Sequence, residues 1–208
     1  MVQEMSSERK LLLATSNPGK VAELSRMVAD LRLEVVGLNA FPDVSEVPEN
    51  GTTFSENAAL KATGYAQQTG LPALADDSGL EVLALGGRPG VHSARYGGDV
   101  PFSEKMRMLL TELDKIGSAN RSARFVSAIA FASPDGIVVG EAEGECTGRI
   151  ADRPLGSGGF GYDPIFIPDR HEATFGELPD AVKARISHRS GAFSQILPIL
   201  ARFFGVLT

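Results

Sequence analysis

The strongest constraint on the fold lies near the start of the chain. The apolar run Leu11–Ala14 is typical of a short buried strand, and it leads directly into the polar segment Thr15–Lys20. Apolar residues at helical spacing then run from Val21 to Leu31. Asn17 suits a helix N-cap and Pro18 suits the first helical position. The chain is therefore predicted to open with a strand, a tight loop and a helix.

The rest of the sequence continues to interleave strands and helices. Thr53–Glu56 matches a capping box, so a helix is predicted from there to about Gln68. The other predicted strands are Leu33–Leu38, Leu71–Ala75, Phe125–Ala132, Ile137–Glu143 and Ile165–Ile167, with a turn at Ser133–Gly136. The other predicted helices are Ser103–Leu113, Leu178–Ile186 and Ala192–Phe204, the last bent or broken at Pro198. This order predicts an α/β fold with a mixed sheet.

Length and composition narrow the class of protein. The 208 residues fit a single domain, 1–208, in which residues 1–10 form a polar extension. A net charge of −6 argues against nucleic-acid binding, which relies on lysine and arginine. The N-terminus lacks the apolar segment of a secretory signal, and the most apolar stretch, Ile196–Leu207, is too short to cross a membrane. The one cysteine, Cys146, is read as structural, and we expect a cytoplasmic protein.

The loop Thr15–Lys20 is a candidate phosphate site. A loop that opens a helix presents free N–H groups and a partial positive charge, to which this segment adds two hydroxyls, an amide and the Lys20 ammonium. The spacing of a Walker loop is absent. The alternative is an ordinary N-cap beside a solvated lysine.

Carboxylates that could hold Mg²⁺ occur in two places. Asp76 and Asp77 follow the apolar run Leu71–Ala75, so they are predicted at a strand end on the edge of the sheet, where ligands commonly bind. Glu49 and Glu56 lie earlier in the chain, and Mg²⁺ usually takes one or two carboxylates together with substrate phosphates. The alternative for the aspartates is a turn and helix cap; for Glu56 it is the capping box.

Two later segments could contact an organic ligand. Gly156–Pro164 contains a G-x-G-x-x-G spacing, but a proline and a strand follow it, so a dinucleotide loop is excluded and a flexible loop with a stacking aromatic is favoured. Its alternative is a surface loop anchored by Phe160 and Tyr162. Lys183 with Ser187–Arg189 is rich in donors suited to a purine carbonyl, the alternative being a positively charged helix C-terminus.

Taken together, these segments resemble the inosine/xanthosine triphosphate pyrophosphatases, also called the Ham1-like family. The resemblance covers nearly the whole chain in the right order. The segments that carry it are Thr15–Lys20, Gly51–Ala58 with Lys61, Ala75–Leu80, Pro89–Tyr96, Gly156–Pro164 and Ser187–Arg189.

The resemblance implies a fold, a reaction and a set of site residues. The fold would be an elongated mixed β-sheet flanked by helices, with two lobes around a deep nucleotide-binding cleft. Asp77 would be the general base and, with Glu49, a ligand of Mg²⁺, although Glu56 remains open as the second carboxylate. Substrate would be bound by Thr15, Ser16, Asn17, Pro18, Gly19, Lys20, Ser78, Phe160, Gly161, Tyr162, Asp163, Lys183, His188 and Arg189.

The expected reaction is hydrolysis of ITP, dITP or XTP to the monophosphate and pyrophosphate, which would keep these nucleotides out of DNA and RNA. The resemblance also implies a homodimer, with Pro89–Tyr96 near the cleft and the dimer contacts. Two alternatives remain: a Maf-like pyrophosphatase of other specificity, and a nucleotide-binding regulatory module without turnover.

Overall fold

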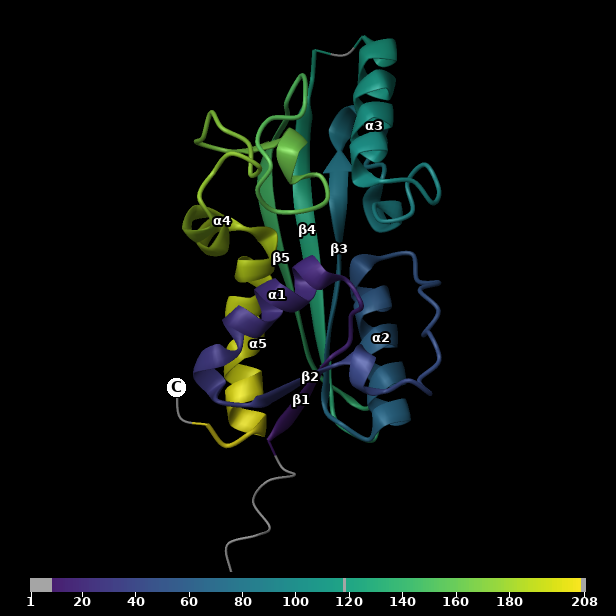
Figure 1. Cartoon of the computed structure of the whole chain (residues 1–208), viewed down its shortest axis with the longest axis vertical. Coiled ribbons are helices and arrows are strands. Elements are labelled where there is room, and N and C mark those ends of the chain that lie inside the picture. Colours follow the sequence, from purple (N-terminus) through teal and green to yellow (C-terminus); the bar gives the residue numbers. More distant parts are fainter. Residues whose placement is uncertain (1–8, 118, 207–208) are drawn as a thin grey trace, which may run out of the picture. The chain divides into compact units, whose positions relative to one another are not determined.

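The structure is a computed structural model, and it describes residues 9–117 and 119–206. The strands are β1 (Lys10–Leu13), β2 (Glu34–Gly37), β3 (Ala73–Val82), β4 (Ser122–Ala132), β5 (Val138–Ile150) and β6 (Phe166–Pro168). The α-helices are α1 (Pro18–Met27), α2 (Phe54–Thr69), α3 (Phe102–Ile116), α4 (Asp180–Ile186) and α5 (His188–Phe203). Figure 1 shows these elements along the chain.

The strands form one six-stranded sheet in the order β2-β1-β3-β4-β5-β6. β1 pairs in parallel with β2 and β3, whereas β5 and β6 pair antiparallel. The predicted α/β fold with a mixed sheet is therefore confirmed. The chain divides into two compact units, the first comprising residues 1–77, 128–144 and 191–208 and the second comprising residues 78–127 and 145–190.

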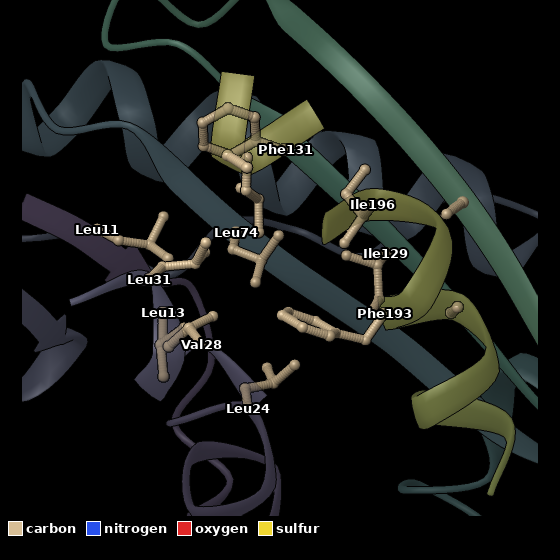
Figure 2. Packing of buried hydrophobic residues seen from close by; sticks show 14 of the residues in the cluster. Leu11, Leu13, Leu24, Val28, Leu31, Leu74, Ile129, Phe131, Phe193 and Ile196 are labelled. Atoms are coloured by element: carbon tan, nitrogen blue, oxygen red, sulfur yellow. The ribbon is translucent and has the colours of Figure 1, made fainter. Parts of the chain in front are cut away.

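The core of the first unit follows from the alternation of strand side chains. Leu11 and Leu13 of β1 point to one face of the sheet, where they pack with Leu24 of α1 and with Phe193 and Ile196 of α5 (Figure 2). Each of these side chains is buried, which stabilises the fold by roughly 1.5–3 kcal/mol per large apolar residue. In Figure 1, α1 and α5 lie on one side of these strands and α2 lies on the other.

The core of the second unit is built around α3. Its predicted apolar face, from Met106 to Leu113, is buried against Leu80 and Val82 of β3. Phe166 lies at the centre of an aromatic group, with ring centroids 4.7 Å from Phe125 and 5.4 Å from Phe175. Cys146 is buried in the same cluster, and burial, followed by the nearby charge of Asp169, raises the pKa of its thiol to about 11. Its reading as a structural residue agrees with this position.

Three expectations about the elements are corrected. β3 does not stop at Ala75 but continues through both aspartates to Val82. α5 begins at His188 and runs past Pro198 without a break, so neither the predicted start at Ala192 nor a break at the proline is found. Lys10 belongs to β1 and not to an extension, while residues 1–8 lie outside the described residues. Among the described residues, no helix is both long and apolar enough to cross a membrane.

Candidate active site

The site in the first unit begins where β1 ends. The N–H groups of Leu12 and Ala14 donate to Pro72 O and Leu74 O of the neighbouring segment, each at 2.9 Å. If β1 continued in this pattern, the N–H group two residues after Ala14 would donate to Asp76 O. The chain instead turns away at Thr15 into α1. Two ammonium groups donate to that carbonyl oxygen: Lys20 Nζ at 3.2 Å and Lys61 Nζ at 2.9 Å. The early end of β1 therefore places two cations beside the middle of β3.

The loop Thr15–Lys20 is organised by Asn17. Its Oδ1 accepts hydrogen bonds from Gly19 N at 2.9 Å and Lys20 N at 3.2 Å, so the predicted N-cap is confirmed, as is Pro18 in the first turn. Lys20 is not a solvated lysine, because its Nζ forms an ion pair with Asp76 Oδ2 at 2.8 Å. Ser16 and Pro18 are exposed, whereas the loop's other residues are half-buried. The loop thus opens a helix with a cation held beside it.

Both carboxylate oxygens of Asp77 accept hydrogen bonds. Its Oδ1 lies 3.0 Å from Lys61 Nζ, and its Oδ2 accepts a hydrogen bond from Asn57 Nδ2 at 3.2 Å. The same Lys61 Nζ lies 3.1 Å from Glu49 Oε1. Asp77 is 6% exposed, and both Asn57 and Lys61 are buried. One ammonium therefore joins the two carboxylates that were predicted to serve the metal.

The position of the aspartates differs from expectation. Asp76 and Asp77 lie in the middle of a ten-residue strand, in neither a turn nor a helix cap, and β3 lies between β1 and β4 and so is not an edge strand of the sheet. β3 continues past the point where its parallel partner β1 ends, so the β3 backbone at the aspartates has no β1 partner, while both aspartate side chains are buried. The aspartates are thus held by strand geometry as well as by their cation partners.

Glu49 and Glu56 have different surroundings. Glu56 Oε2 accepts hydrogen bonds from Thr52 N at 2.6 Å, Thr52 Oγ1 at 2.9 Å and Thr53 N at 3.1 Å. These bonds, the one from the Thr52 backbone first, lower the pKa of Glu56. Glu56 thus serves the predicted capping box, whereas Glu49 is directed at Lys61.

The charge state of Lys61 follows from its neighbours. Burial by itself lowers the pKa of Lys61, but the carboxylates of Asp77 and Glu49 and the hydrogen bond to Asp77 outweigh that effect. The pKa of Lys61 therefore lies above the ordinary lysine value, and the side chain is a cation at neutral pH.

A separate cluster lies in the second unit and centres on Asp163. Its Oδ2 accepts hydrogen bonds from Lys183 Nζ at 2.6 Å and Phe160 N at 2.7 Å. Lys183 Nζ also lies 4.6 Å from the centroid of the Phe160 ring, within the range of a cation–π contact. Gly159 has a φ of +69°, and a Cβ there would clash with Asp163 Oδ2, so this turn needs glycine.

His188, Arg189 and Ser78 complete this second cluster. Arg189 Nη2 donates to Ser78 Oγ at 2.9 Å, and its guanidinium carbon lies 5.7 Å from the Phe160 ring centroid. The His188 ring stacks on the Phe125 ring, with the ring centroids 4.8 Å apart and an angle of 12° between the ring planes. The expected alternative, a positive helix C-terminus, is wrong for this pair, because His188 and Arg189 begin α5. Arg189 is only 1% exposed, so its charge is held deep in the protein.

Two neighbours of Phe160 in the loop, Gly161 and Tyr162, pack against other residues of the second unit. Tyr162 is buried and its hydroxyl donates to Ser93 O at 3.0 Å, so it anchors the loop to the core of the second unit. Burial raises the pKa of this phenol. Gly161 is half-buried beside the ring of Phe102. Phe160 is half-buried and is the loop aromatic with cations over its ring.

The site in the first unit is the first cluster, made of Lys20, Glu49, Asn57, Lys61, Asp76 and Asp77. No role was predicted from the sequence for two of these residues, Asn57 and Lys61. Both are buried polar side chains on α2, four residues apart and therefore on one helix face. The sequence signal available for them was this spacing of two polar residues directly after a capping box. The neighbouring sequence does not show that this face of α2 packs against β3. The contact depends on how the helix packs on the sheet.

The arrangement is that of an α/β protein with cations and carboxylates gathered at the end of a short parallel strand. Comparison with models of protein families matches residues 11–199 to the Ham1 family. A relative from Nostoc sp. called dITP/XTP pyrophosphatase is 48% identical, covering 92% of this chain and 94% of its own length. The relative of the same name from Deinococcus radiodurans is also 48% identical, and the match covers 91% of this chain and 92% of the relative's length. The chain belongs to the Ham1 family.

Solved structures agree with this assignment. A HAM1 protein from Coxiella burnetii has a TM-score of 0.84 at 40% identity, covering 93% of this chain and 99% of that one. A Mycobacterium abscessus structure described as a nucleoside-triphosphatase and dITP/XTP pyrophosphatase has a TM-score of 0.72 at 45% identity, covering 91% and 99%. The resemblance noted from the sequence is thereby confirmed.

Proposed function

We propose that this protein hydrolyses non-canonical purine nucleoside triphosphates, namely dITP, XTP and ITP, to the monophosphate and pyrophosphate. The observation that carries the proposal is the pairing of Lys20 with Asp76 and of Lys61 with Asp77 and Glu49 at the end of β1. The names of the relatives, dITP/XTP pyrophosphatase, support the same reaction.

The first cluster would bind the triphosphate. Thr15–Lys20 offers the Thr15 and Ser16 hydroxyls, the Lys20 ammonium and the partial positive charge of the α1 N-terminus, which together favour bound phosphate; the Gly19 and Lys20 N–H groups expected to be free already donate to Asn17 Oδ1. Asp77 and Glu49 suit Mg²⁺, because their carboxylates offer the oxygen ligands that this ion prefers and both approach one cation, Lys61 Nζ, at 3.0 and 3.1 Å. A bound Mg²⁺ would supply charge stabilisation to the phosphates.

The chemical step needs a base beside the α-phosphorus. Asp77 would accept a proton from water as the water oxygen attacks phosphorus; the bond from the α-phosphorus to the bridging oxygen breaks, and pyrophosphate leaves with that oxygen. Lys20 and Lys61 would stabilise the charge that develops on the phosphates. Catalysis would come mainly from positioning and from electrostatic stabilisation.

The second cluster would bind the base. The Phe160 ring can stack on a purine, and Lys183, His188 and Arg189 are donors suited to the O6 acceptor of hypoxanthine or xanthine. Adenine carries an amino group at that position and would leave a buried donor without an acceptor. Such a mismatch can discriminate by roughly 10⁴-fold.

The decisive experiment is pyrophosphate release from dITP, XTP, ITP, GTP, ATP and dTTP, each with Mg²⁺ and with EDTA. We expect metal-dependent release from dITP, XTP and ITP, with little from the others. Equal release from all six would refute the assignment of the second cluster to base selection. Nucleotide binding without release would favour a regulatory module instead.

The assembly and the location of the protein are further parts of the proposal. We propose a homodimer, with Pro89–Tyr96 contributing to its contacts, acting in the cytoplasm on free nucleotides. Sedimentation equilibrium measures the first point directly, since a dimer has twice the mass of the 22.0 kDa chain.

A further inference from the structure

The segment that carries Glu49 is held along α2. This segment, residues 45–52, is called the strap here; in Figure 1 the connection that precedes α2 runs beside that helix. Ser45 N donates to Gln68 Oε1 at 2.8 Å, and Gln68 Nε2 donates back to Ser45 O at 3.1 Å. Val47 N donates to Tyr65 Oη at 3.3 Å.

The contacts continue toward the start of the helix. Glu49 meets Lys61 at 3.1 Å, and Gly51 N donates to Asn57 Oδ1 at 2.8 Å. Every second strap residue thus meets one α2 side chain per turn. The spacing along the strap is similar to the spacing along the helix, because two residues of an extended segment span roughly 6.6 Å and one turn of an α-helix rises 5.4 Å. The position of Glu49 is therefore set by its register on α2.

Asn57 joins this register to Asp77. Its Oδ1 accepts from Gly51 N, and its Nδ2 donates to Asp77 Oδ2 at 3.2 Å. The amide of Asn57 carries its acceptor and its donors on two different atoms, so each partner determines which atom faces it. Asn57 is completely buried, so neither contact is easily replaced by water.

We propose that Asn57 is a positioning residue that sets the relative placement of Asp77 and Glu49. One amide aims the Asp77 carboxylate and anchors the strap two residues after Glu49. The inference rests on the proposed function, because it assigns Asn57 to the same carboxylate pair. It predicts that divalent-cation affinity and turnover depend on Asn57 more than on any other strap anchor that does not touch Asp77.

The test compares Asn57→Leu with the control Gln68→Met. Asn57→Leu keeps the branched shape of the side chain and Gln68→Met keeps its unbranched form, and each removes two hydrogen bonds. Gln68 is exposed, and its amide bonds to Ser45 and not to Asp77. The measurements are Mn²⁺ binding to the nucleotide-free protein by titration calorimetry, kcat and KM for dITP with Mg²⁺, and the thermal midpoint.

For Asn57→Leu we expect Mn²⁺ affinity and kcat to fall by roughly 10–100-fold, the range for lost partners of metal ligands, with KM close to that of the parent protein. Gln68→Met should keep both values. If the two variants lose thermal stability but bind Mn²⁺ equally well, Asn57 is only structural and the proposal is wrong.

A second variant serves if Asn57→Leu does not fold. A Cβ on Gly51 would lie 2.7 Å from Glu56 Cβ and 2.8 Å from Asn57 Oδ1, so Gly51→Ala must shift the strap while leaving both side chains present. Weakened Mn²⁺ binding in Gly51→Ala supports the proposal, and unchanged binding overturns it. Failure of the parent protein to release pyrophosphate would instead refute the proposed function, since the Mn²⁺ comparison needs no turnover.

Discussion

At the scale of single residues, the first cluster sets two cations against three carboxylates. Two lysines and the carboxylates of Asp76, Asp77 and Glu49 lie within 3.1 Å of one another in pairs. Buried charges are tolerated only when they are paired and hydrogen-bonded, and removing one partner leaves the other uncompensated. The same residues can therefore affect both stability and chemistry, and experiments must separate the two.

Asp77→Asn is expected to abolish turnover while leaving nucleotide binding largely intact. An amide keeps the size of the carboxylate, and its one oxygen can still accept a hydrogen bond from Asn57 or from Lys61, but it cannot accept a proton from water. Rates of pyrophosphate release from dITP, together with nucleotide binding by calorimetry, check this. Near-normal turnover in the variant would exclude Asp77 as the base.

At the scale of elements, the start of α2 shows how local chemistry determines a boundary. Thr53 Oγ1 accepts from Glu56 N at 3.1 Å while Glu56 Oε2 accepts from Thr53 N at 3.1 Å. This reciprocal pair is readable from four consecutive residues. The direction of the helix then carries Asn57 and Lys61 to the sheet and Gln68 to the far end of the strap.

Thr53→Ala should lower the free energy of unfolding by about 0.5–2 kcal/mol, because α2 loses its N-cap. Thr63→Ala is the matched control, since Thr63 lies inside the same helix and bonds only back to its own turn. Urea unfolding followed by circular dichroism measures both. Equal losses in the two variants would mean that the cap contributes nothing specific.

The same capping box has a defined pH dependence. The pKa of Glu56 is lowered in the folded state. The stabilisation of the fold by the Glu56 carboxylate is therefore present at pH values above the ordinary glutamate pKa and is lost as the pH falls through the lowered pKa. Comparison of Glu56→Gln with the parent protein across acidic pH should therefore show the stability difference shrinking as pH falls. If the stability difference between the two proteins does not change with pH, the ionised carboxylate of Glu56 does not strengthen the capping box.

At the scale of the whole molecule, charge separates this protein from nucleic-acid binders. The chain carries 20 lysines and arginines against 26 aspartates and glutamates, and several of the cations are already held by carboxylates. A free nucleotide can be bound by one local basic site, but a duplex needs many exposed cations.

We therefore expect no measurable affinity for duplex DNA at about 0.15 M ionic strength, where interactions between exposed charges are screened beyond roughly 8 Å. Fluorescence anisotropy of a labelled duplex, titrated with protein, provides the measurement. Saturable binding would show that an exposed basic surface exists and would reopen the question of the substrate.

The sequence by itself determined most of the elements, the α/β class and the family, since strand alternation, helical spacing, the Asn17 cap and the Thr53 box are all local. It could not show that β3 passes through Asp76 and Asp77, because two carboxylates in mid-strand are stable only beside Lys20, Lys61 and Asn57. Nor could it distinguish Glu49 from Glu56 as the carboxylate near Asp77. Tertiary structure decided both points, because they depend on contacts between α1, α2, the strap and β3, residues far apart in sequence.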